Sequence, residues 1–236
     1  MAIIVIPIRL GSTRLPRKAL LDICGKPMIQ RVYENALKSG LQVYVATCDE
    51  EIFHVVEGFG GKAVMTRADH ICGTDRIIEA VQNIDTDKVI NIQGDEPLIN
   101  IDCISRLEKA LEVAPMASLM VKISPEDAEN PNLVKVICDK NNNALYFSRA
   151  KIPYERNPLE GSFYGHIGVY GYTKEFLLKY GAMQKTPYEK CESLEQLRVL
   201  ENGYKIKMLE VKEKPLGVDT SEDYVKVCEE FEKLLK

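Results

Sequence analysis

Short apolar runs alternate with amphipathic stretches along the first half of the chain. Residues 3–6 are all β-branched and predict a strand buried on both faces, which ends at Pro7 because proline donates no hydrogen bond to a sheet. Further strands are predicted over residues 41–47, 62–66, 88–92 and 117–123. Apolar residues at helical spacing predict helices over 28–37, 49–56, 77–83 and 101–113. This alternation is typical of an α/β protein with a doubly wound sheet.

The second half of the chain has a different pattern. Residues 134–138 and 144–148 flank a polar turn and predict a β-hairpin, and the Gly- and Tyr-rich stretch 164–173 predicts another strand. These strands lack intervening helices, so we expect a small β lobe over about residues 133–173, inserted in a single domain of residues 1–236. The lobe could form a wall of a sugar pocket, a dimer interface, or both. Helices are expected at 174–180, at 191–202 and from Glu222, with a strand at 204–211.

Composition narrows the class of protein. Hydrophobic residues make up 45% of the 236 residues and charged residues 28%, which is ordinary for a globular protein. The formal net charge of -4 argues against a nucleic-acid partner. The 7 cysteines are scattered singly without metal-ligand spacing, and no signal peptide precedes them, which favours a reducing, cytoplasmic location. Because no apolar run approaches about 20 residues, membrane insertion is not expected.

The first predicted strand runs directly into a cationic loop. Arg9, Gly11, Ser12, Arg14 and Lys18 follow its carboxyl end, where open α/β sheets bind ligands. Backbone N–H groups and guanidinium forks at this place suit a triphosphate. The loop has neither the Walker A pattern nor the dinucleotide fingerprint, because the required glycines are missing. The alternative is a solvated basic loop without a ligand.

Acidic residues follow another buried strand. Asp95 and Glu96 come after Gly94 at the end of the strand 88–92, and Mg²⁺ prefers one or two carboxylates together with substrate phosphates. Alternatively, Asp95 caps the next helix, which Pro97 partly supports. Asp219 is a further carboxylate just after a strand-like segment, and helix capping explains it equally well.

The loop of residues 67–76 also has two interpretations. It is polar, contains Gly73 and precedes a helix, so it could close over a nucleotide base. Equally, Thr74 could simply cap that helix. His70 alone is a weak signal, because a single loop histidine is more often a hydrogen-bonded residue than a ligand.

Several short blocks occur in a fixed order between residue 3 and about residue 224. They read IPIRLGSTRLPRKALLDICGKPMI, MTRADHICGTDR, NIQGDEP, NPNLVKVICD with ALYFSRAKIPY, HIGVYGY, SLEQLRVLENGYKI and GVDT. The ordered set resembles the 3-deoxy-manno-octulosonate cytidylyltransferase (CMP-Kdo synthetase) family over nearly the whole chain. The resemblance implies a mixed sheet of the GT-A-like nucleotidyltransferase kind, with the small β lobe used for homodimerisation. It also implies that CTP and 3-deoxy-manno-octulosonate (Kdo) react with Mg²⁺ to give CMP-Kdo and pyrophosphate, for lipopolysaccharide synthesis.

The resemblance further implies roles for individual residues. The CTP phosphates would be held by Arg9, Ser12, Arg14 and Lys18. The cytosine would be bordered by Gly73 and Thr74. Magnesium would be bound by Asp95 and Asp219, and the catalytic set would be Lys18, Arg14, Asp95 and Asp219. The Kdo site would be lined by Gln93, Arg149, His166, Tyr170, Glu195 and Gln196.

Four positions depart from the family pattern. Ile8 stands where such enzymes usually have Ala, Arg17 where many have Gly, Ala19 where many have Pro, and Cys72 where Ser is common. Cys72 could alter contacts at the base. Two alternatives to Kdo activation stay open: a cytidylyltransferase for another acidic sugar, such as an amino-Kdo or a sialic acid, and a non-catalytic nucleotide-binding homologue.

Overall fold

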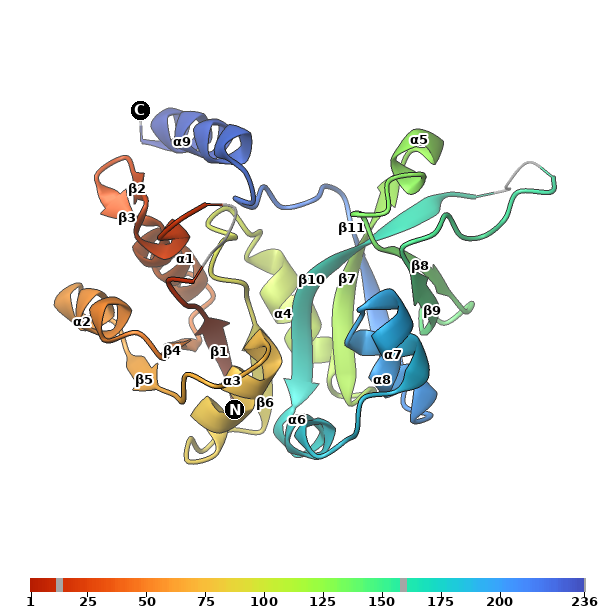
Figure 1. Ribbon diagram of the computed structural model, residues 1–236, viewed down its shortest axis with the longest axis horizontal. Coiled ribbons are helices and arrows are strands. Elements are labelled where there is room, and N and C mark those ends of the chain that lie inside the picture. The colour runs from red at the N-terminus through yellow and green to blue at the C-terminus, as the bar shows by residue number, and fades with distance from the viewer. Residues whose placement is uncertain (12–14, 158–160, 236) are drawn as a thin grey trace. The chain divides into compact units, whose positions relative to one another are not determined.

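The computed structural model describes residues 1–11, 15–157 and 161–235, and the chain forms two units (Figure 1). The first unit contains residues 1–105 and 215–236, and the second contains residues 106–214. The expectation of one domain of residues 1–236 with a β lobe at about 133–173 stays a prediction. Within the part of the chain that the structure describes, no helix has the length and apolarity needed to cross a membrane.

The first unit is built on a parallel sheet. Its central strand is β1 (Ala2–Pro7), which pairs in parallel with β4 (Gln42–Thr47) on one side and β6 (Lys88–Asn91) on the other. Strand β5 (Ala63–Met65) extends the sheet beyond β4, again in parallel. All six residues of β1 are buried, as expected for a β-branched strand covered on both faces.

Short helices and a two-stranded ribbon accompany this sheet. They are η1 (Lys18–Leu20), β2 (Asp22–Ile23), β3 (Lys26–Pro27), α1 (Met28–Leu37), α2 (Glu50–Gly58), α3 (Gly73–Val81) and α9 (Ser221–Leu234). Helix α9 lies beside the β2–β3 ribbon, although it is far from it in sequence (Figure 1). The Tyr224 hydroxyl donates to the Asp22 carbonyl at 2.5 Å, and the Arg31 guanidinium lies 4.9 Å from the centre of the Phe231 ring. The boundary between the two units falls within α4 (Asp102–Ala110).

The second unit has a mixed sheet. Strand β7 (Met116–Ile123) lies between β11 (Ile206–Val211), which is parallel to it, and β10 (Phe163–Thr173), which is antiparallel. The predicted hairpin is present as β8 (Lys135–Cys138) and β9 (Ala144–Ser148), and β8 also pairs with β10. The helices of this unit are α5 (Pro125–Ala128), α6 (Lys174–Gly181), α7 (Pro187–Glu192) and α8 (Gln196–Glu201).

One predicted element of this unit was wrong in extent, and one element was not predicted. The helix predicted over residues 191–202 is divided between α7 and α8, because Ser193 takes a left-handed conformation with φ of 54° that an α-helix cannot continue. The segment 124–132, for which the sequence predicted no element, contains α5. The Ser124 hydroxyl caps that helix by accepting a hydrogen bond from Asp127 N at 3.0 Å.

Candidate active site

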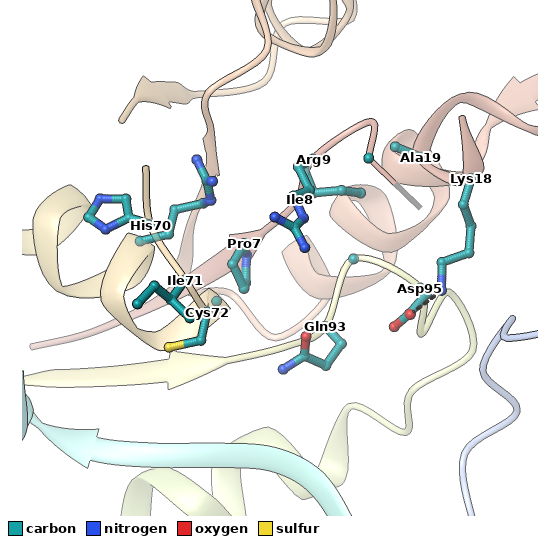
Figure 2. A pocket seen from close by; sticks show the side chains of 14 residues that line it. Pro7, Ile8, Arg9, Lys18, Ala19, His70, Ile71, Cys72, Gln93 and Asp95 are labelled. Atoms are coloured by element: carbon teal, nitrogen blue, oxygen red, sulfur yellow. Dashed lines mark hydrogen bonds and ion pairs between the residues drawn. The ribbon is translucent and has the colours of Figure 1, made fainter. Parts of the chain in front are cut away.

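A pocket of about 320 Å³ opens at the carboxyl ends of β1 and β6 (Figure 2). Its walls come from four parts of the first unit: the end of β1 and the loop after it (Pro7, Ile8, Arg9 and Gly11), residues 18–19 of η1, residues 70–73 at the start of α3 together with Arg76, and residues 93–95 after β6. This is the place at which open α/β sheets bind ligands, because the loops that leave adjacent parallel strands diverge there. Described residues of the cationic loop (Arg9, Gly11 and Lys18) and of the loop 67–76 (residues 70–73 and Arg76) therefore line one pocket.

Lys18 joins the two aspartates that the sequence singled out. Its ammonium lies 2.5 Å from Asp95 Oδ2 and 3.6 Å from Asp219 Oδ1, and it donates to the Val218 carbonyl at 2.9 Å. The Lys18 side chain is only 16% exposed, so water screens these contacts weakly. Figure 2 shows Lys18 reaching toward Asp95 at one end of the pocket.

The segments that carry the two aspartates are also joined through their backbones. Val218 N donates to the Asp95 carbonyl at 2.9 Å. A Cβ atom at Gly217 would lie 3.4 Å from that same carbonyl oxygen, so glycine allows the two segments to approach closely. Asp95 does not cap a helix, since the next one, α4, begins only at Asp102. The alternative explanation of Asp95 is therefore wrong.

The donor set at this point fits a hard divalent cation that also binds phosphate oxygens. Asp95 and Asp219 supply carboxylate oxygens that converge on one point, as their shared contact with Lys18 indicates. Across residues 1–11, 15–157 and 161–235, no group of three or more His, Cys, Asp or Glu side chains could hold a metal ion. A cation here would therefore take its other ligands from a bound molecule or water.

The loop after β1 is anchored by side chains at the start of α2. Asp49 occupies the position before α2, but its carboxylate accepts a hydrogen bond from Leu10 N at 2.8 Å instead of capping the helix. Arg17 forms an ion pair with Glu51 of α2. Arg9 lines the pocket and is exposed, while Ser12 and Arg14 lie outside the described residues. Asp49, at the start of the helix predicted over 49–56, therefore anchors the loop and does not cap α2 through its side chain.

The wall of the pocket formed by residues 70–73 depends on a close backbone approach. A Cβ atom at Gly73 would lie 3.4 Å from Pro7 Cγ, so this residue lets the start of α3 pack against the end of β1. Helix α3 begins at Gly73 and Cys72 precedes it, so Thr74 lies inside the first turn and is not the cap. His70 also lines the pocket and is paired with Glu79 on α3.

Arg76 also lines this pocket, and the sequence reasoning overlooked it. It is 3% exposed and donates to Thr66 Oγ1 at 2.5 Å. A buried arginine one turn into a helix gives no signal in the hydrophobic pattern, where it looks like a solvated polar position.

The structure shows the local consequences of two of the four departures from the family pattern. Arg17 has a φ of 55° and a ψ of 30°, a left-handed conformation that glycine adopts most easily. Ile8 fills space that Gly94 leaves open, because a Cβ atom on Gly94 would lie 2.5 Å from Ile8 Cδ1. Ala19 is buried in the wall of the pocket, and Cys72 lines it with intermediate exposure.

The predicted sugar residues are divided between the units. Gln93 lines the pocket of the first unit, and Arg149, His166, Tyr170, Glu195 and Gln196 belong to the second. Within the second unit, His166 and Tyr170 are neighbours on β10, with ring centroids 5.4 Å apart.

Arg149 and the pair of Glu195 and Gln196 are fixed by local structure of the second unit. Arg149 N donates to Glu192 Oε2 at 2.9 Å, and Arg149 Nε donates to the Glu192 carbonyl at 2.8 Å. Glu195 precedes α8, and Gln196 is its buried first residue.

His166 is neutral at ordinary pH. Burial of the imidazole lowers its pKa from 6.5 to about 4, because the charged form loses hydration. A neutral imidazole offers one hydrogen-bond donor and one acceptor, whereas the charged form offers two donors.

The comparisons with known proteins agree with a nucleotide site of this kind. A family model described as cytidylyltransferase matches residues 3–206, and this defines the class. A 3-deoxy-manno-octulosonate cytidylyltransferase of Francisella tularensis subsp. holarctica is 51% identical over 97% of both chains, and one of Fusobacterium nucleatum is 49% identical over 94% of both. The chain belongs to the 3-deoxy-manno-octulosonate cytidylyltransferase family.

Solved structures extend the comparison to the fold. A CMP:2-keto-3-deoxy-manno-octonic acid synthetase complexed with CTP superimposes with a TM-score of 0.95 at 44% identity, over 99% of both chains. HddC from Yersinia pseudotuberculosis, at 19% identity and a TM-score of 0.69, shares the fold. The α/β class predicted from the sequence is thus confirmed.

Proposed function

We propose that the protein transfers CMP from CTP to the anomeric hydroxyl of Kdo, giving CMP-Kdo and pyrophosphate. The observation that carries this proposal is the meeting of Lys18 with Asp95 and Asp219 at the pocket into which the cationic loop opens. The names of relatives that are about half identical over nearly the full chain support the choice of substrates.

In the proposed reaction, the sugar hydroxyl attacks the α-phosphorus of CTP in line with the departing pyrophosphate. Arg9 and Lys18, with Ser12 and Arg14, bind the phosphate oxygens, and Arg14 and Lys18 stabilise the charge that develops on pyrophosphate. Gly73 and Thr74 border the cytosine. Such a transfer depends mainly on positioning and electrostatics, so no protein nucleophile is needed.

Asp95 and Asp219 are the residues that would hold Mg²⁺. When bound, the ion offsets the repulsion between the anionic sugar and the triphosphate and lowers the pKa of the attacking hydroxyl. Lys18 already neutralises part of the charge of this acidic pair in the structure.

Gln93, Arg149, His166, Tyr170, Glu195 and Gln196 are proposed to bind the sugar acid. Arg149 is the permanent cation of this set and suits the sugar carboxylate, because a guanidinium matches a carboxylate in charge and geometry. We also propose, on the resemblance alone, that the protein is a cytoplasmic homodimer that supplies lipopolysaccharide synthesis.

Pyrophosphate release tests the proposed function directly. The protein is incubated with CTP and Mg²⁺, with and without Kdo, and with a panel that includes an amino-Kdo and a sialic acid. Release that requires Kdo and stops when a chelator removes the metal supports the proposal. Release with another sugar acid alone assigns a sister activity, and no release with any sugar acid indicates a non-catalytic homologue.

A further inference from the structure

Ser118 lies at the centre of a small hydrogen-bonded cluster inside the second unit. It is a fully buried residue of β7, and its hydroxyl oxygen lies 3.0 Å from His166 Nε2. The same oxygen lies 3.1 Å from the Ile167 carbonyl and 2.9 Å from the Val169 carbonyl. Strand β10 has a register shift between Ile167 and Tyr170 that directs both carbonyls toward the one hydroxyl.

The three contacts determine where the protons lie. The Ser118 hydroxyl has one proton, and both carbonyl oxygens can only accept. If this proton pointed at His166 Nε2, two oxygen–oxygen contacts of 2.9 and 3.1 Å would have no proton between them and would be repulsive. If the hydroxyl proton is shared between the two carbonyls in a bifurcated hydrogen bond, a lone pair of the hydroxyl accepts from a protonated Nε2, and none of the three contacts lacks a proton.

We propose that Ser118 fixes His166 in the tautomer with the proton on Nε2, so that Nδ1 is a hydrogen-bond acceptor for a hydroxyl group of the sugar substrate. Ser118 is then a positioning residue, because it acts through His166 and not on the substrate. The part that concerns the sugar depends on the function proposed above, whereas the tautomer follows from the cluster itself.

The surroundings of His166 support this assignment. The Phe147 ring packs edge-on against the imidazole with centroids 5.1 Å apart, and the Tyr170 ring lies 5.4 Å away on β10, so the ring is held between aromatic neighbours. Among the residues that the structure describes, Ser118 is the only hydrogen-bonding partner of the imidazole. Burial also keeps the ring neutral, so that only one of its nitrogens bears a proton.

The tautomer also predicts which group of the sugar His166 recognises. An unprotonated Nδ1 repels a carboxylate but accepts from a hydroxyl. Recognition of the sugar carboxylate is thereby left to a cation such as Arg149. In this arrangement His166 recognises a hydroxyl group of the acidic sugar, and Arg149 recognises its carboxylate.

Nitrogen NMR of the histidine rings tests the tautomer in the folded enzyme without any variant. The protein has 3 histidines, and His166→Gln identifies the signals of interest by their disappearance. We expect wild-type His166 to show a protonated Nε2 and an unprotonated Nδ1. In Ser118→Ala we expect both tautomers to be populated, and in Ser118→Thr, which keeps the hydroxyl, we expect the wild-type pattern.

Steady-state kinetics tests the consequence for the sugar. Because one hydrogen bond contributes about 1 kcal/mol, Ser118→Ala should raise KM for Kdo about fivefold. The KM for CTP and kcat should change by less than about twofold, because Ser118 acts only through His166, which is proposed to contact the sugar and not CTP. Ser118→Thr should restore the KM for Kdo. Ser124→Ala is the matched control, because it removes the α5 cap from the same unit and leaves His166 untouched.

The possible results separate the two parts of the inference. A wild-type signal with the proton on Nδ1 overturns it, as does a Ser118→Ala variant with an unchanged tautomer and an unchanged KM for Kdo. If Ser118→Ala changes the tautomer of His166 but leaves the KM for Kdo unchanged, Ser118 keeps its role in fixing the tautomer and His166 is rejected as a sugar ligand. An equal rise in KM for Kdo in Ser124→Ala would show a general loss of stability and reject the positioning role.

Discussion

Lys18 and its two carboxylate neighbours concentrate opposite charges at one point of the pocket. Lys18 is held by Asp95 Oδ2 and by the Val218 carbonyl, so its ammonium is oriented before any ligand arrives. Preoriented charges stabilise a developing negative charge with little reorganisation, which is the main source of rate enhancement in many enzymes. The consequence at the scale of residues is that the loss of one charged oxygen should affect turnover far more than folding.

Substitution of Asp95 tests that consequence. We expect Asp95→Asn to reduce kcat about a hundredfold or more, because under the proposed function it removes the carboxylate that would hold Mg²⁺ and that orients the Lys18 ammonium. The circular dichroism spectrum should stay unchanged. Asp102→Asn is the control, since Asp102 is exposed on the first turn of α4 and does not line the pocket. Near-normal activity of Asp95→Asn in saturating magnesium would count against the proposed function.

Arg17 provides a test of backbone strain. Its left-handed conformation costs a residue with a Cβ atom about 1 kcal/mol, whereas glycine adopts it readily. Arg17→Gly and Arg17→Ala both remove the exposed ion pair with Glu51, so their difference isolates the backbone. We expect the glycine variant to be more stable than the alanine variant by about 1 kcal/mol in urea unfolding. Equal stability of the two variants would contradict the prediction.

The pH dependence of stability should report on His166. Its pKa is about 4 in the folded protein and 6.5 as a free side chain, so only the unfolded chain takes up the proton between these values. This contribution to stability is fully present above pH 6.5 and is lost as the pH falls toward 4. The loss should reach about 3 kcal/mol at pH 4, since one pKa unit corresponds to about 1.4 kcal/mol.

The measurement compares two proteins across the same pH range. Urea unfolding of the wild type and of His166→Gln is followed from pH 7 to pH 4, and the difference in unfolding free energy is plotted against pH. The unfolding free energy of the wild type relative to that of His166→Gln should fall by the predicted amount as the pH falls, because the variant lacks the titrating group. A difference independent of pH would mean that the ring is not neutral in the folded state.

The end of β1 and the turn after β6 fit together as a pair of elements. Ile8, just after β1, occupies the space in which Gly94 lacks a side chain. We expect Gly94→Ala to destabilise the protein by about 1–3 kcal/mol, because the new methyl group would overlap Ile8. Ile8→Ala/Gly94→Ala removes the overlap with Ile8 Cδ1 and Cγ1 and leaves a contact of 3.1 Å with the Cβ atom. The double variant should therefore lose less unfolding free energy than the sum of the losses in the two single variants. A double-mutant cycle from urea unfolding measures this coupling, and strict additivity would contradict it.

Elements with a plain hydrophobic pattern were predictable from the sequence, and those that depend on a single backbone conformation were not. The strand predicted at 41–47 is β4 (Gln42–Thr47), because its apolar run coincides with its burial. The break at Ser193 was missed because serine gives no signal for a left-handed conformation. The short α5 was missed for a related reason, since its polar sequence resembles a loop and only the cap at Ser124 marks it.

The same distinction applies to the site. Lys18, Asp95 and Gly73 were predictable as members of one pocket because each follows or precedes a buried element at the carboxyl edge of the parallel sheet. Arg76 and the anchoring role of Asp49 depend on side-chain directions that residue types alone do not fix. The second-unit cluster around Ser118 was likewise unpredictable, because it depends on the irregular pairing of β10.

At the scale of the whole molecule, the first unit is discontinuous in sequence. Its residues 215–236 return after the second unit is complete, and α9 packs through Phe231, which is 9% exposed and lies beside Arg31. We expect Phe231→Ala to lower the unfolding free energy by about 3 kcal/mol, as for other buried aromatic residues. Leu234→Ala on the same helix is the control, because Leu234 is 70% exposed and should matter by less than about 0.5 kcal/mol. Both variants are measured by thermal and by urea unfolding. An equal loss of stability in Phe231→Ala and Leu234→Ala would contradict the packing of α9.

The late return of residues 215–236 also sets an order of events during synthesis. A ribosome makes Lys18 soon after β1, but it reaches Asp219 only after every strand named above has been translated. The nascent polypeptide therefore carries the ammonium long before it acquires the second carboxylate that meets it. Under the proposed function, catalytic competence is thus deferred until translation is nearly finished, whatever the speed at which the sheets themselves fold.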